Sequence, residues 1–434
     1  MSSAFFWCII FLFAMAGIGA PIALSMIASS VVYLLLKGQD IGLAAEQMIQ
    51  GLYDGFLLLA IPLFIVAANI MNAGTISERL LKFCLALVGR FRGGLGHVNV
   101  VANMIFAGMS GSAVADAVGL GKIIIDLMRK DNRYSPGYAA AITAAASTIG
   151  PIIPPSIPMV MYALVSDASI GYLFLGGFVP GVMMGIALMM LNAHMARREN
   201  VPLEEPVPRS ELPRLTVRAL PALLMPIILL FGIYGGATTP TEAAAIAAFY
   251  ALLVATFLYR AVSFRVLHKV FSESARATAS VGLVIGASLI FNYIVASENI
   301  PAKVSELLQG MNVSPLAFLL AVNALFLILG CLLDATTIIL VIIPLFIPTC
   351  KALGIDLVHF GVTAVVNCMI GLITPPYGVL LFVINAITGI PLKTIIGAIW
   401  PYVAALITSL LIMLLVPDTV LFLPKLFGYI VGSN

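Results

Sequence analysis

Two short polar stretches interrupt long apolar runs, and both carry residues that could bind a cation. "GMSGSAVAD" (108–116) supplies hydroxyl groups and Asp116, and "GCLLDATT" (330–337) supplies Asp334 and two threonines. Hydroxyl, carbonyl and carboxylate oxygens are hard ligands that suit Na⁺, or a carboxylate that carries a coupled proton. Carboxylates in membrane-embedded surroundings are rare and functional by default, so Asp116 and Asp334 are the first candidates.

Two proline-rich breaks accompany these stretches, "IGPIIPPSIPMV" (149–160) and "GLITPPYG" (371–378). Proline removes an amide donor and forbids a regular helix. Non-helical backbone at membrane depth persists only where it is buried in protein or lines a cavity, because unpaired groups cost several kcal/mol in hydrocarbon. Each break alone could be a packing kink. Together with the polar stretches they predict a binding site, in which helix C-termini and free carbonyls attract cations and helix N-termini attract anions.

The composition indicates an integral membrane protein. Of 434 residues 62% are hydrophobic and 9% are charged, and the mean hydropathy is +1.12. Apolar runs recur along the chain, and a run of about 20 such residues can span a bilayer as a helix. We therefore expect an all-α polytopic bundle embedded in the lipid bilayer. The N-terminal apolar stretch has no Lys or Arg before it, so it is interpreted as a first membrane helix rather than a cleaved signal peptide.

Several other functions are disfavoured. The sequence has no nucleophile–base pair or metal cluster, and "AVGLGK" (117–122) lacks the spacing of a phosphate-binding loop, so no enzyme activity, cofactor or nucleic-acid partner is expected. Glu242 in "TPTEAAA" is interpreted as a helix cap rather than an ion ligand. The cysteines form no CxxC pair and are interpreted as packing residues: Cys8, Cys84, Cys331, Cys350 and Cys368.

An internal repeat divides the chain at a polar linker, residues 196–218. Four blocks recur in order at an offset of about 220 residues: 17–29 pairs with 235–248, 64–81 with 290–308, 108–116 with 330–338, and 152–160 with 372–382. A constant offset over four blocks favours gene duplication over chance similarity of apolar helices.

Each half is expected to contain the same elements. In the first half we predict helices at 4–17, 20–36 and 55–73, amphipathic stretches at 42–53 and 76–89, a re-entrant hairpin at 97–128, a broken helix at 136–165 and a last helix at 171–195. In the second half we predict helices at 219–235, 240–259 and 278–296, a hairpin at 313–349, a broken helix at 358–387 and a last helix at 393–416. Each half is thus expected to cross the membrane five times. Because five is an odd number, the second repeat must be inverted in the membrane relative to the first.

The distribution of charge agrees with this topology. With the N-terminus outside, the expected cytoplasmic loops carry 18 of the 22 Lys and Arg residues, as the positive-inside rule requires. The first hairpin then enters from the cytoplasm and the second from outside. Their tips are expected to approach each other near the middle of the membrane.

The sequence resembles the large membrane subunit of tripartite ATP-independent periplasmic (TRAP) transporters. The likeness covers essentially the whole chain and rests on "GGLGHVNV", "GMSGSAVADAVGLG", "GPIIPPSIPMVMYA", "TPTEAAAIAA" and the long stretch that begins with "DATTIILVIIPLFIP". It implies a permease of the bacterial inner membrane with a periplasmic N-terminus, which imports an organic acid together with Na⁺. The acid would be sialic acid, a C4-dicarboxylate or a sugar acid. The implied partners are a small four-helix membrane subunit and a periplasmic substrate-binding protein.

The resemblance also implies an elevator mechanism like that of the divalent-anion/sodium symporters, which this family resembles in architecture. Residues 96–195 and 311–434 would form the moving transport domain, including the two hairpins and the two broken helices. Residues 1–95 and 219–310 would form the scaffold. A stand-alone sodium/carboxylate symporter without a binding protein remains the alternative, and a passive channel is the alternative from another class.

The resemblance places sodium ligands at the hairpin tips and the helix breaks. The expected set is Gly108, Ser110, Gly111, Ser112, Ser147, Gly150, Gly330, Asp334, Thr337, Gly371 and Thr374. Substrate contacts are expected at Ser112, Asp116, Pro154, Ser156, Thr336, Pro375 and Tyr377. Many of these ligands would be backbone carbonyl oxygens, so the type of side chain is weak evidence for any one of these positions.

Overall fold

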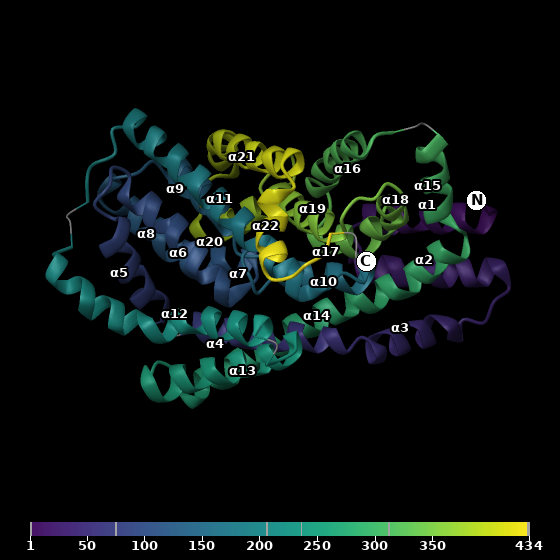
Figure 1. Ribbon diagram of the computed structural model, residues 1–434, viewed down its shortest axis with the longest axis horizontal. Coiled ribbons are helices and arrows are strands. Elements are labelled where there is room, and N and C mark those ends of the chain that lie inside the picture. The colour runs from purple at the N-terminus through teal and green to yellow at the C-terminus, as the bar shows by residue number, and fades with distance from the viewer. Residues whose placement is uncertain (1, 74–75, 205–206, 236, 311–312, 432–434) are drawn as a thin grey trace.

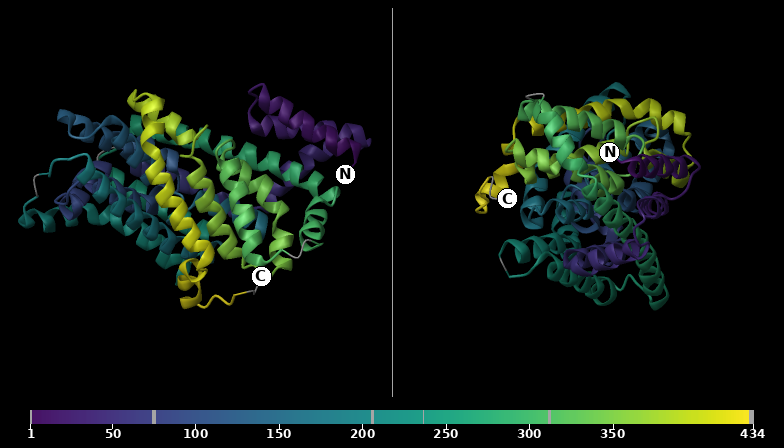
Figure 2. Two further views of the ribbon diagram at one scale, coloured as in Figure 1. Left: turned by 90° about the horizontal axis from the view of Figure 1, so that it is seen from above. Right: turned by 90° about the vertical axis from the view of Figure 1, so that its right-hand side faces the viewer.

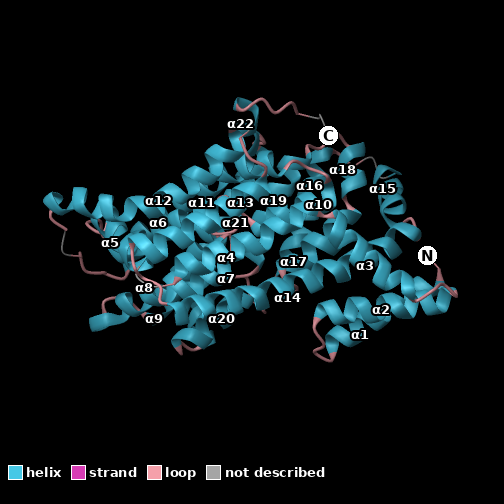
Figure 3. Cartoon of the chain, turned by 90° about the horizontal axis from the view of Figure 1, so that it is seen from below, coloured by secondary structure: helices cyan, strands magenta, loops and turns pink. Residues whose placement is uncertain are grey.

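The chain folds entirely into helices and connecting loops. The computed structural model describes all residues except 1, 74–75, 205–206, 236, 311–312 and 432–434, and no strand occurs among those described (Figure 3). This confirms the all-α fold predicted from the sequence.

The first half contains eleven α-helices and three short η segments. They are α1 (Ser3–Gly17), α2 (Ile22–Lys37), α3 (Gly42–Asp54), η1 (Phe56–Leu59), α4 (Ala60–Asn72), α5 (Ile76–Val88), α6 (Gly94–Ser110), α7 (Ala113–Asp116), η2 (Ala117–Gly121), α8 (Lys122–Arg129), η3 (Lys130–Asn132), α9 (Pro136–Ser147), α10 (Ile157–Ser166) and α11 (Ile170–Arg198). The counts refer to the described residues.

The second half follows the same order. Its elements are η4 (Arg209–Glu211), α12 (Leu212–Tyr234), α13 (Pro240–Leu253), η5 (Val254–Leu258), α14 (Phe264–Ser297), α15 (Ile300–Gly310), α16 (Pro315–Gly330), α17 (Ala335–Thr337), η6 (Ile338–Ile342), η7 (Ile343–Leu345), α18 (Ile347–Ala352), α19 (Leu357–Gly371), α20 (Val379–Thr388), α21 (Leu392–Leu415) and α22 (Asp418–Leu426).

Capping residues in the sequence determine where several of these helices begin. The Ser135 hydroxyl accepts a hydrogen bond from the Tyr138 N–H at the start of α9, and Asp356 accepts one from the Val358 N–H at the start of α19. Such caps satisfy amide groups that have no partner within the helix. Thr239 and Glu242 form a reciprocal capping box at α13, which confirms the predicted capping role of Glu242.

The same features mark the repeat in the structure. The caps Ser135 and Asp356 lie 221 positions apart, and so do η2 and η6, two of the three π-helical segments among the described residues. Each repeat also has a Pro-Pro pair joined by a cis peptide bond in the break of its broken helix, Pro154–Pro155 in the first half and Pro375–Pro376 in the second. These matching features of the two halves therefore support the gene duplication that was inferred from the sequence blocks.

We describe the helices in two groups, which also contact each other where α4 and α5 pack against α6 and α15 packs against α18. The frame helices are α1–α5 and α12–α15: α4 packs against α13 and α14, and α12 packs against α5 and α13. The hairpin helices are α6–α11 and α16–α22: α9 and α11 pack against α21, and α16 packs against α19. Helices α3, α12 and α13 lie along the lower side of the molecule in Figure 1, and α14 runs obliquely from α13 toward α15. Helices α1 and α2 project at one end, beside α14 (Figure 2).

Two buried polar bridges occupy equivalent places in the two repeats. The Asn99 amide donates to the Thr143 hydroxyl at 2.6 Å and joins α6 to α9. The Asn367 amide donates to the backbone carbonyl of Asn323 at 2.6 Å and joins α16 to α19. All four side chains are buried. A hydrogen bond in such surroundings is strong, because the alternative is an unpaired polar group. Each bridge fastens the first arm of a hairpin to the following broken helix.

Five helices of the described chain are long and apolar enough to cross a membrane alone. They are α11, α12, α13 with η5, α14 and α21. Helices α4 and α5 form a pair bent by 71°. Helices α1 and α2 have 15 and 16 residues, which is shorter than the typical span of about 20 residues.

Most predicted elements are confirmed within a few residues, but some boundaries differ. Helix α14 begins at Phe264 rather than near 278, α12 begins at Leu212 rather than 219, and α11 continues to Arg198. Much of the predicted linker 196–218 is therefore helical. The C-terminal helix α22 was not predicted. Helix α14 begins directly after the Ser263 cap, and its first turns contain charged residues. Hydropathy alone would start the helix only after these charged residues.

Candidate functional site

The first hairpin reverses at Gly111 and Ser112. Helix α6 ends at Ser110, Gly111 adopts a positive φ of 59°, and the Ser112 hydroxyl caps α7 by accepting a hydrogen bond from the Ala115 N–H at 3.4 Å. A Cβ atom on Gly111 would lie 2.7 Å from the Pro155 carbonyl oxygen. Both the left-handed backbone and this close approach require glycine. The tip of the first hairpin is therefore in close contact with the first proline break.

The second hairpin reverses at Leu333 and Asp334. Asp334 caps α17: one carboxylate oxygen accepts the Thr337 N–H at 3.1 Å, and the other accepts the Thr337 hydroxyl at 2.5 Å. A Cβ atom on Gly371 would lie 2.6 Å from the Gly330 Cα. The end of the first hairpin arm therefore touches the end of α19 backbone to backbone. No side chain fits between them.

The two breaks lie beside these tips. Between α9 and α10, Ser156 accepts a hydrogen bond from the Met159 N–H at 3.2 Å and donates to the Pro151 carbonyl. Between α19 and α20, the Thr374 hydroxyl donates to the Ile370 carbonyl at 2.7 Å. These local bonds stabilise the backbone of both breaks.

A cavity of about 340 Å³ lies where both tips and both breaks converge. It is lined from the first hairpin by residues 110–115, from the first break by Pro151, Ile157, Pro158 and Met161, from the second hairpin by residues 334–336, and from the second broken helix by Met369, Leu372 and Val379. The convergence of the two tips is the arrangement expected from the inverted topology.

The expected site residues divide into two sets in the structure. Ser110, Gly111, Ser112, Asp334 and Thr336 line the cavity. The others do not line it: Gly108, Asp116, Ser147, Gly150, Pro154, Ser156, Gly330, Thr337, Gly371, Thr374, Pro375 and Tyr377. Most of this second set is buried next to the tips and breaks, but the Tyr377 side chain is 54% exposed and lies against Phe382. Their roles as ligands remain predictions.

Asp116 is the unusual member of the buried set. It is fully buried, and neither of its carboxylate oxygens makes a hydrogen bond of good geometry with a described residue, although the Ser110 hydroxyl lies close by. Its carboxylate contacts the backbone at Gly150, in the first break. A buried, uncompensated carboxylate is strongly unfavourable, so this group requires a cation or a proton.

The frame helices close the cavity on the other side. Ile65, Ala68 and Asn69 of α4 and Ala277 and Val281 of α14 line it, and none of them was predicted from the sequence. The Asn69 amide donates to the Ser274 hydroxyl at 2.9 Å, which ties the two frame helices together at the cavity wall. The sequence feature that could have indicated this wall is Asn69, a polar residue within an apolar helix and inside the repeat block 64–81.

The lining of this cavity contains one ionisable residue, Asp334. Lysine and arginine are absent from it, and the described part of the chain holds no group of three or more His, Cys, Asp and Glu side chains that could bind a metal ion. An anion in this cavity would therefore have to be stabilised by helix N-termini and bound cations rather than by a basic side chain.

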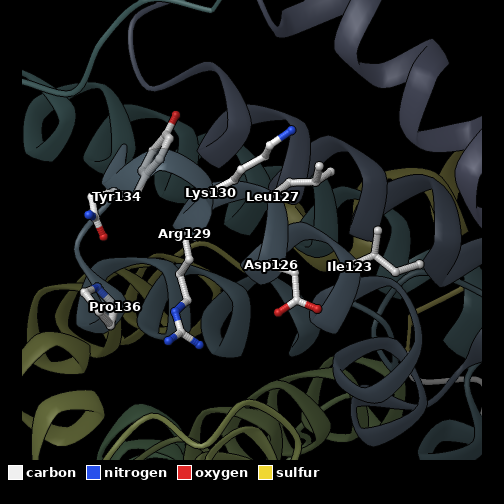
Figure 4. A pocket seen from close by; sticks show the side chains of 8 residues that line it. Ile123, Asp126, Leu127, Arg129, Lys130, Tyr134 and Pro136 are labelled. Atoms are coloured by element: carbon white, nitrogen blue, oxygen red, sulfur yellow. The ribbon is translucent and has the colours of Figure 1, made fainter.

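A larger cavity of about 570 Å³ lies elsewhere, at the turn between α8 and α9 (Figure 4). Asp126, Arg129, Lys130 and Tyr134 contribute to it, and the Asp126 and Lys130 side chains point in different directions. It is at the opposite end of the hairpin arm from Gly111 and shares no residue with the tips. We therefore do not assign it to the candidate site at the hairpin tips.

Comparison with known proteins gives a consistent result. Residues 9–419 match the family described as "Tripartite ATP-independent periplasmic transporter, DctM component". The chain is 39% identical over 413 residues to the sialic acid TRAP transporter large permease protein SiaM of Vibrio cholerae, covering 95% of this chain and 96% of that protein. It is 40% identical over 375 residues to the C4-dicarboxylate TRAP transporter large permease protein DctM of Pseudomonas aeruginosa, covering 86% and 88%.

A third relative and a solved structure extend the comparison. The 2,3-diketo-L-gulonate TRAP transporter large permease protein YiaN of Escherichia coli is 38% identical over 405 residues, covering 93% of this chain and 95% of that protein. The fold resembles the YdaH transporter of Alcanivorax borkumensis, with a TM-score of 0.62 at 15% identity over 85% of this chain and 86% of that one. With a family match over nearly its whole length, the chain belongs to the DctM component family of TRAP transporters and is a multi-pass membrane permease rather than an enzyme.

Proposed function

We propose that this chain is the large permease subunit of a Na⁺-coupled importer of an organic acid. The observation that carries the proposal is the cavity of about 340 Å³ at which the two hairpin tips and the two proline breaks converge. Inverted-repeat secondary transporters bind substrate and coupling ions at such a junction of broken helices.

An acidic substrate suits the chemistry of this cavity. The relatives SiaM, DctM and YiaN are named for sialic acid, C4-dicarboxylates and 2,3-diketo-L-gulonate, all of which are acids. Helix α10 begins at Ile157, and its first turn lines the cavity, as does Val379 at the start of α20. The partial positive charge of these N-termini stabilises a carboxylate without a basic side chain.

Coupling to Na⁺ suits the two acidic residues. Asp334 lies in the cavity wall, and Asp116 is buried directly behind the first break without a compensating partner among the described residues. Na⁺ bound beside each tip would neutralise these carboxylates and add positive charge next to the substrate. Binding of the acid and of the ions would then favour each other, which is the physical basis of symport.

An elevator movement suits the position of the cavity. One wall belongs to the hairpin helices and the other to the frame helices α4 and α14. We propose that the hairpin helices form the transport domain and carry the tips with their ligands past a stationary scaffold made of the frame helices. The substrate would thereby face each side of the membrane in turn.

The family assigns the chain to a transporter of several components. We propose that it acts with a small four-helix membrane subunit and a periplasmic binding protein that delivers the acid. The excess of Lys and Arg at the ends of the helices expected in the cytoplasm supports an inner-membrane orientation with the N-terminus in the periplasm.

Uptake into proteoliposomes tests the proposal. The full chain and its small subunit are reconstituted, and uptake of labelled sialic acid and of a panel of C4-dicarboxylates and sugar acids is measured with and without a Na⁺ gradient and the binding protein. Saturable uptake of one acid that requires both Na⁺ and the binding protein is the expected result. Uptake that needs Na⁺ but no binding protein would identify a stand-alone symporter, and non-saturable flux would indicate a channel.

A further inference from the structure

A second, strongly basic cavity lies between α5 and α12, away from the transport site. Its volume is about 360 Å³, and its lining residues are Glu78, Arg79, Lys82, Leu215 and Arg218. Three cationic side chains therefore face one carboxylate. None of the three takes part in an ion pair with a residue that the structure describes. The cavity thus holds an excess of positive charge without a partner in this part of the chain.

Two interactions hold the basic groups in place. The Arg79 guanidinium lies over the Tyr259 ring, 4.2 Å from its centroid. The hydroxyl of the same tyrosine donates a hydrogen bond to the Arg218 backbone carbonyl at 2.8 Å. Stacking on an aromatic ring fixes the plane of a guanidinium and leaves its N–H groups free for an anion. Arg79 and the backbone that carries Arg218 are thus positioned through one side chain.

The cavity lies where the exposed charged face of α5 meets the apolar surface of α12. Helix α5 turns away from α4 by 71°, buries Leu80, Leu81 and Cys84, and exposes Lys82. Helix α12 is apolar, yet most of its surface is uncovered by protein. Figure 1 shows α5 and the beginning of α12 at the same end of the molecule.

The uncovered face of α12 continues from the cavity toward the middle of the helix. Val217, Ile227 and Phe231 are 68%, 54% and 78% exposed. In a bilayer, exposed apolar helix surface of this kind would contact acyl chains, because these are as apolar as the side chains. A ligand with a negatively charged head and long apolar tails therefore matches the cavity and the helix beside it.

We propose that this cavity binds the phosphate group of an anionic phospholipid from the surrounding leaflet. Arginine forms bidentate hydrogen bonds to phosphate oxygens, and basic pockets between membrane helices recognise anionic headgroups. The acyl chains would lie along Val217 and the apolar residues that follow it on α12. This lipid site is independent of the transported acid and of its coupling ion.

The test measures lipid binding to the full-length chain in nanodiscs. Nanodiscs of phosphatidylcholine with phosphatidylglycerol are prepared with the unmodified protein and with the double variant R79Q/R218Q. Lipids that remain bound after release from the disc are identified by native mass spectrometry. Each basic group near a membrane surface contributes about fivefold in affinity. The double variant should therefore retain phosphatidylglycerol at least about tenfold less well, with phosphatidylcholine unchanged.

Arg214 provides the matched control. It is exposed on α12 about one turn before Arg218 and does not line the cavity, so R214Q removes the same charge and should retain the lipid. Elution as a single species in size-exclusion chromatography checks the fold of each variant, and the single variant K82Q replaces the double variant if that one aggregates. Equal retention by the unmodified protein and the cavity variants would overturn the proposal.

A second arm distinguishes a lipid from free phosphate. Inorganic phosphate is added at millimolar concentration to the unmodified protein before lipid release. If the site takes a lipid headgroup, phosphate should displace little phosphatidylglycerol, because the tails add binding energy along α12. Complete displacement would instead identify a site for the free anion and overturn the assignment to lipid.

Discussion

Asp334 uses both of its oxygens within its own helical turn, and it is still the ionisable residue that faces the transport cavity. The equivalent N-cap in the first repeat is Ser112. The buried acid of that repeat, Asp116, directly precedes η2, and the residue that directly precedes η6 in the second repeat is Thr337. Each repeat therefore carries one acid at a different depth. The two ion sites that we propose are similar in backbone but not in side-chain chemistry.

Replacing Asp334 by alanine should abolish Na⁺-dependent uptake. The variant loses the carboxylate at the cavity and the N-cap of α17, while membrane insertion depends on apolar spans that are unchanged. Uptake and its Na⁺ dependence are measured in proteoliposomes that contain equal amounts of inserted protein. Asp126→Ala, which removes an exposed acid on α8, is the control and should transport normally. Wild-type Na⁺ dependence in the Asp334 variant would remove this residue from the site.

Replacing Gly111 by valine should also block uptake. A Cβ atom would lie 2.7 Å from the Pro155 oxygen. In addition, a β-branched residue at the φ of 59° found at this position costs about 1–3 kcal/mol. The tip would have to move away from the break. Gly397→Val in α21 is the matched control, because nothing lies within 4 Å of its Cβ position. Normal uptake by the Gly111 variant would contradict the close contact between tip and break.

At the scale of elements, the polar bridges hold each hairpin arm to its broken helix. Asn99 with Thr143 joins α6 to α9, and Asn323 with Asn367 joins α16 to α19, through hydrogen bonds between buried side chains. They allow an arm and a break to move as one unit, and they lie behind the tips rather than in the cavity. Their role is therefore one of stability.

Asn367→Ala should destabilise the protein by about 1–3 kcal/mol, the cost of leaving a buried partner without its hydrogen bond. The measurement is thermal unfolding of the purified protein in detergent. Asn99→Ala should have a similar effect, because it breaks the equivalent bridge. Thr408→Ala, which removes an exposed hydroxyl bonded to its own helix, should have none. An unchanged melting temperature for both asparagine variants would show that the bridges contribute nothing.

The sequence predicted elements better than it predicted the site. Helix existence, the hairpins and the breaks follow from hydropathy, proline and glycine, which act locally, so their positions agree with the structure. The cavity depends on which helices meet, and Ala68 or Val281 have no local feature that distinguishes them from core residues. The resemblance places Tyr377 among the substrate contacts, but its side chain is 54% exposed and does not line the cavity.

At the scale of the whole molecule, the contacts between frame and hairpin helices decide whether one group can move against the other. Asn72 at the end of α4 lies against Gly119 of the first hairpin: a Cβ atom on Gly119 would be 3.0 Å from the asparagine side-chain oxygen. This contact joins the proposed scaffold to the proposed transport domain.

A cysteine pair at positions 72 and 119 should stop transport when it is cross-linked. The Asn72 Cγ lies 3.5 Å from the Cβ position of residue 119, so cysteines at these two positions are within reach of a short bifunctional thiol reagent. An elevator cannot move while its two parts are joined. Uptake is measured before and after cross-linking, with each single cysteine variant as a control. Full uptake by a completely cross-linked protein would exclude movement between these two groups.

Cysteine labelling should place Leu203→Cys in the cytoplasm and Asp40→Cys in the periplasm. Both positions are exposed, and the five native cysteines are buried, so background labelling is low. The measurement uses a membrane-impermeant thiol reagent on intact cells and on inverted membranes. Labelling of position 203 in intact cells would reverse the proposed orientation.

Helix α14 is longer than a bilayer is thick, and it forms part of the cavity wall. Its 34 residues extend about 51 Å at the usual rise, whereas the hydrocarbon core of a bilayer is about 30 Å thick. One unbroken rod thus connects a charged segment at the membrane surface to Ala277 and Val281 in the cavity wall. A thinner bilayer is accommodated by tilting such a rod, and tilting displaces that wall. The stiffness and thickness of the host membrane therefore become determinants of the shape of the binding cavity.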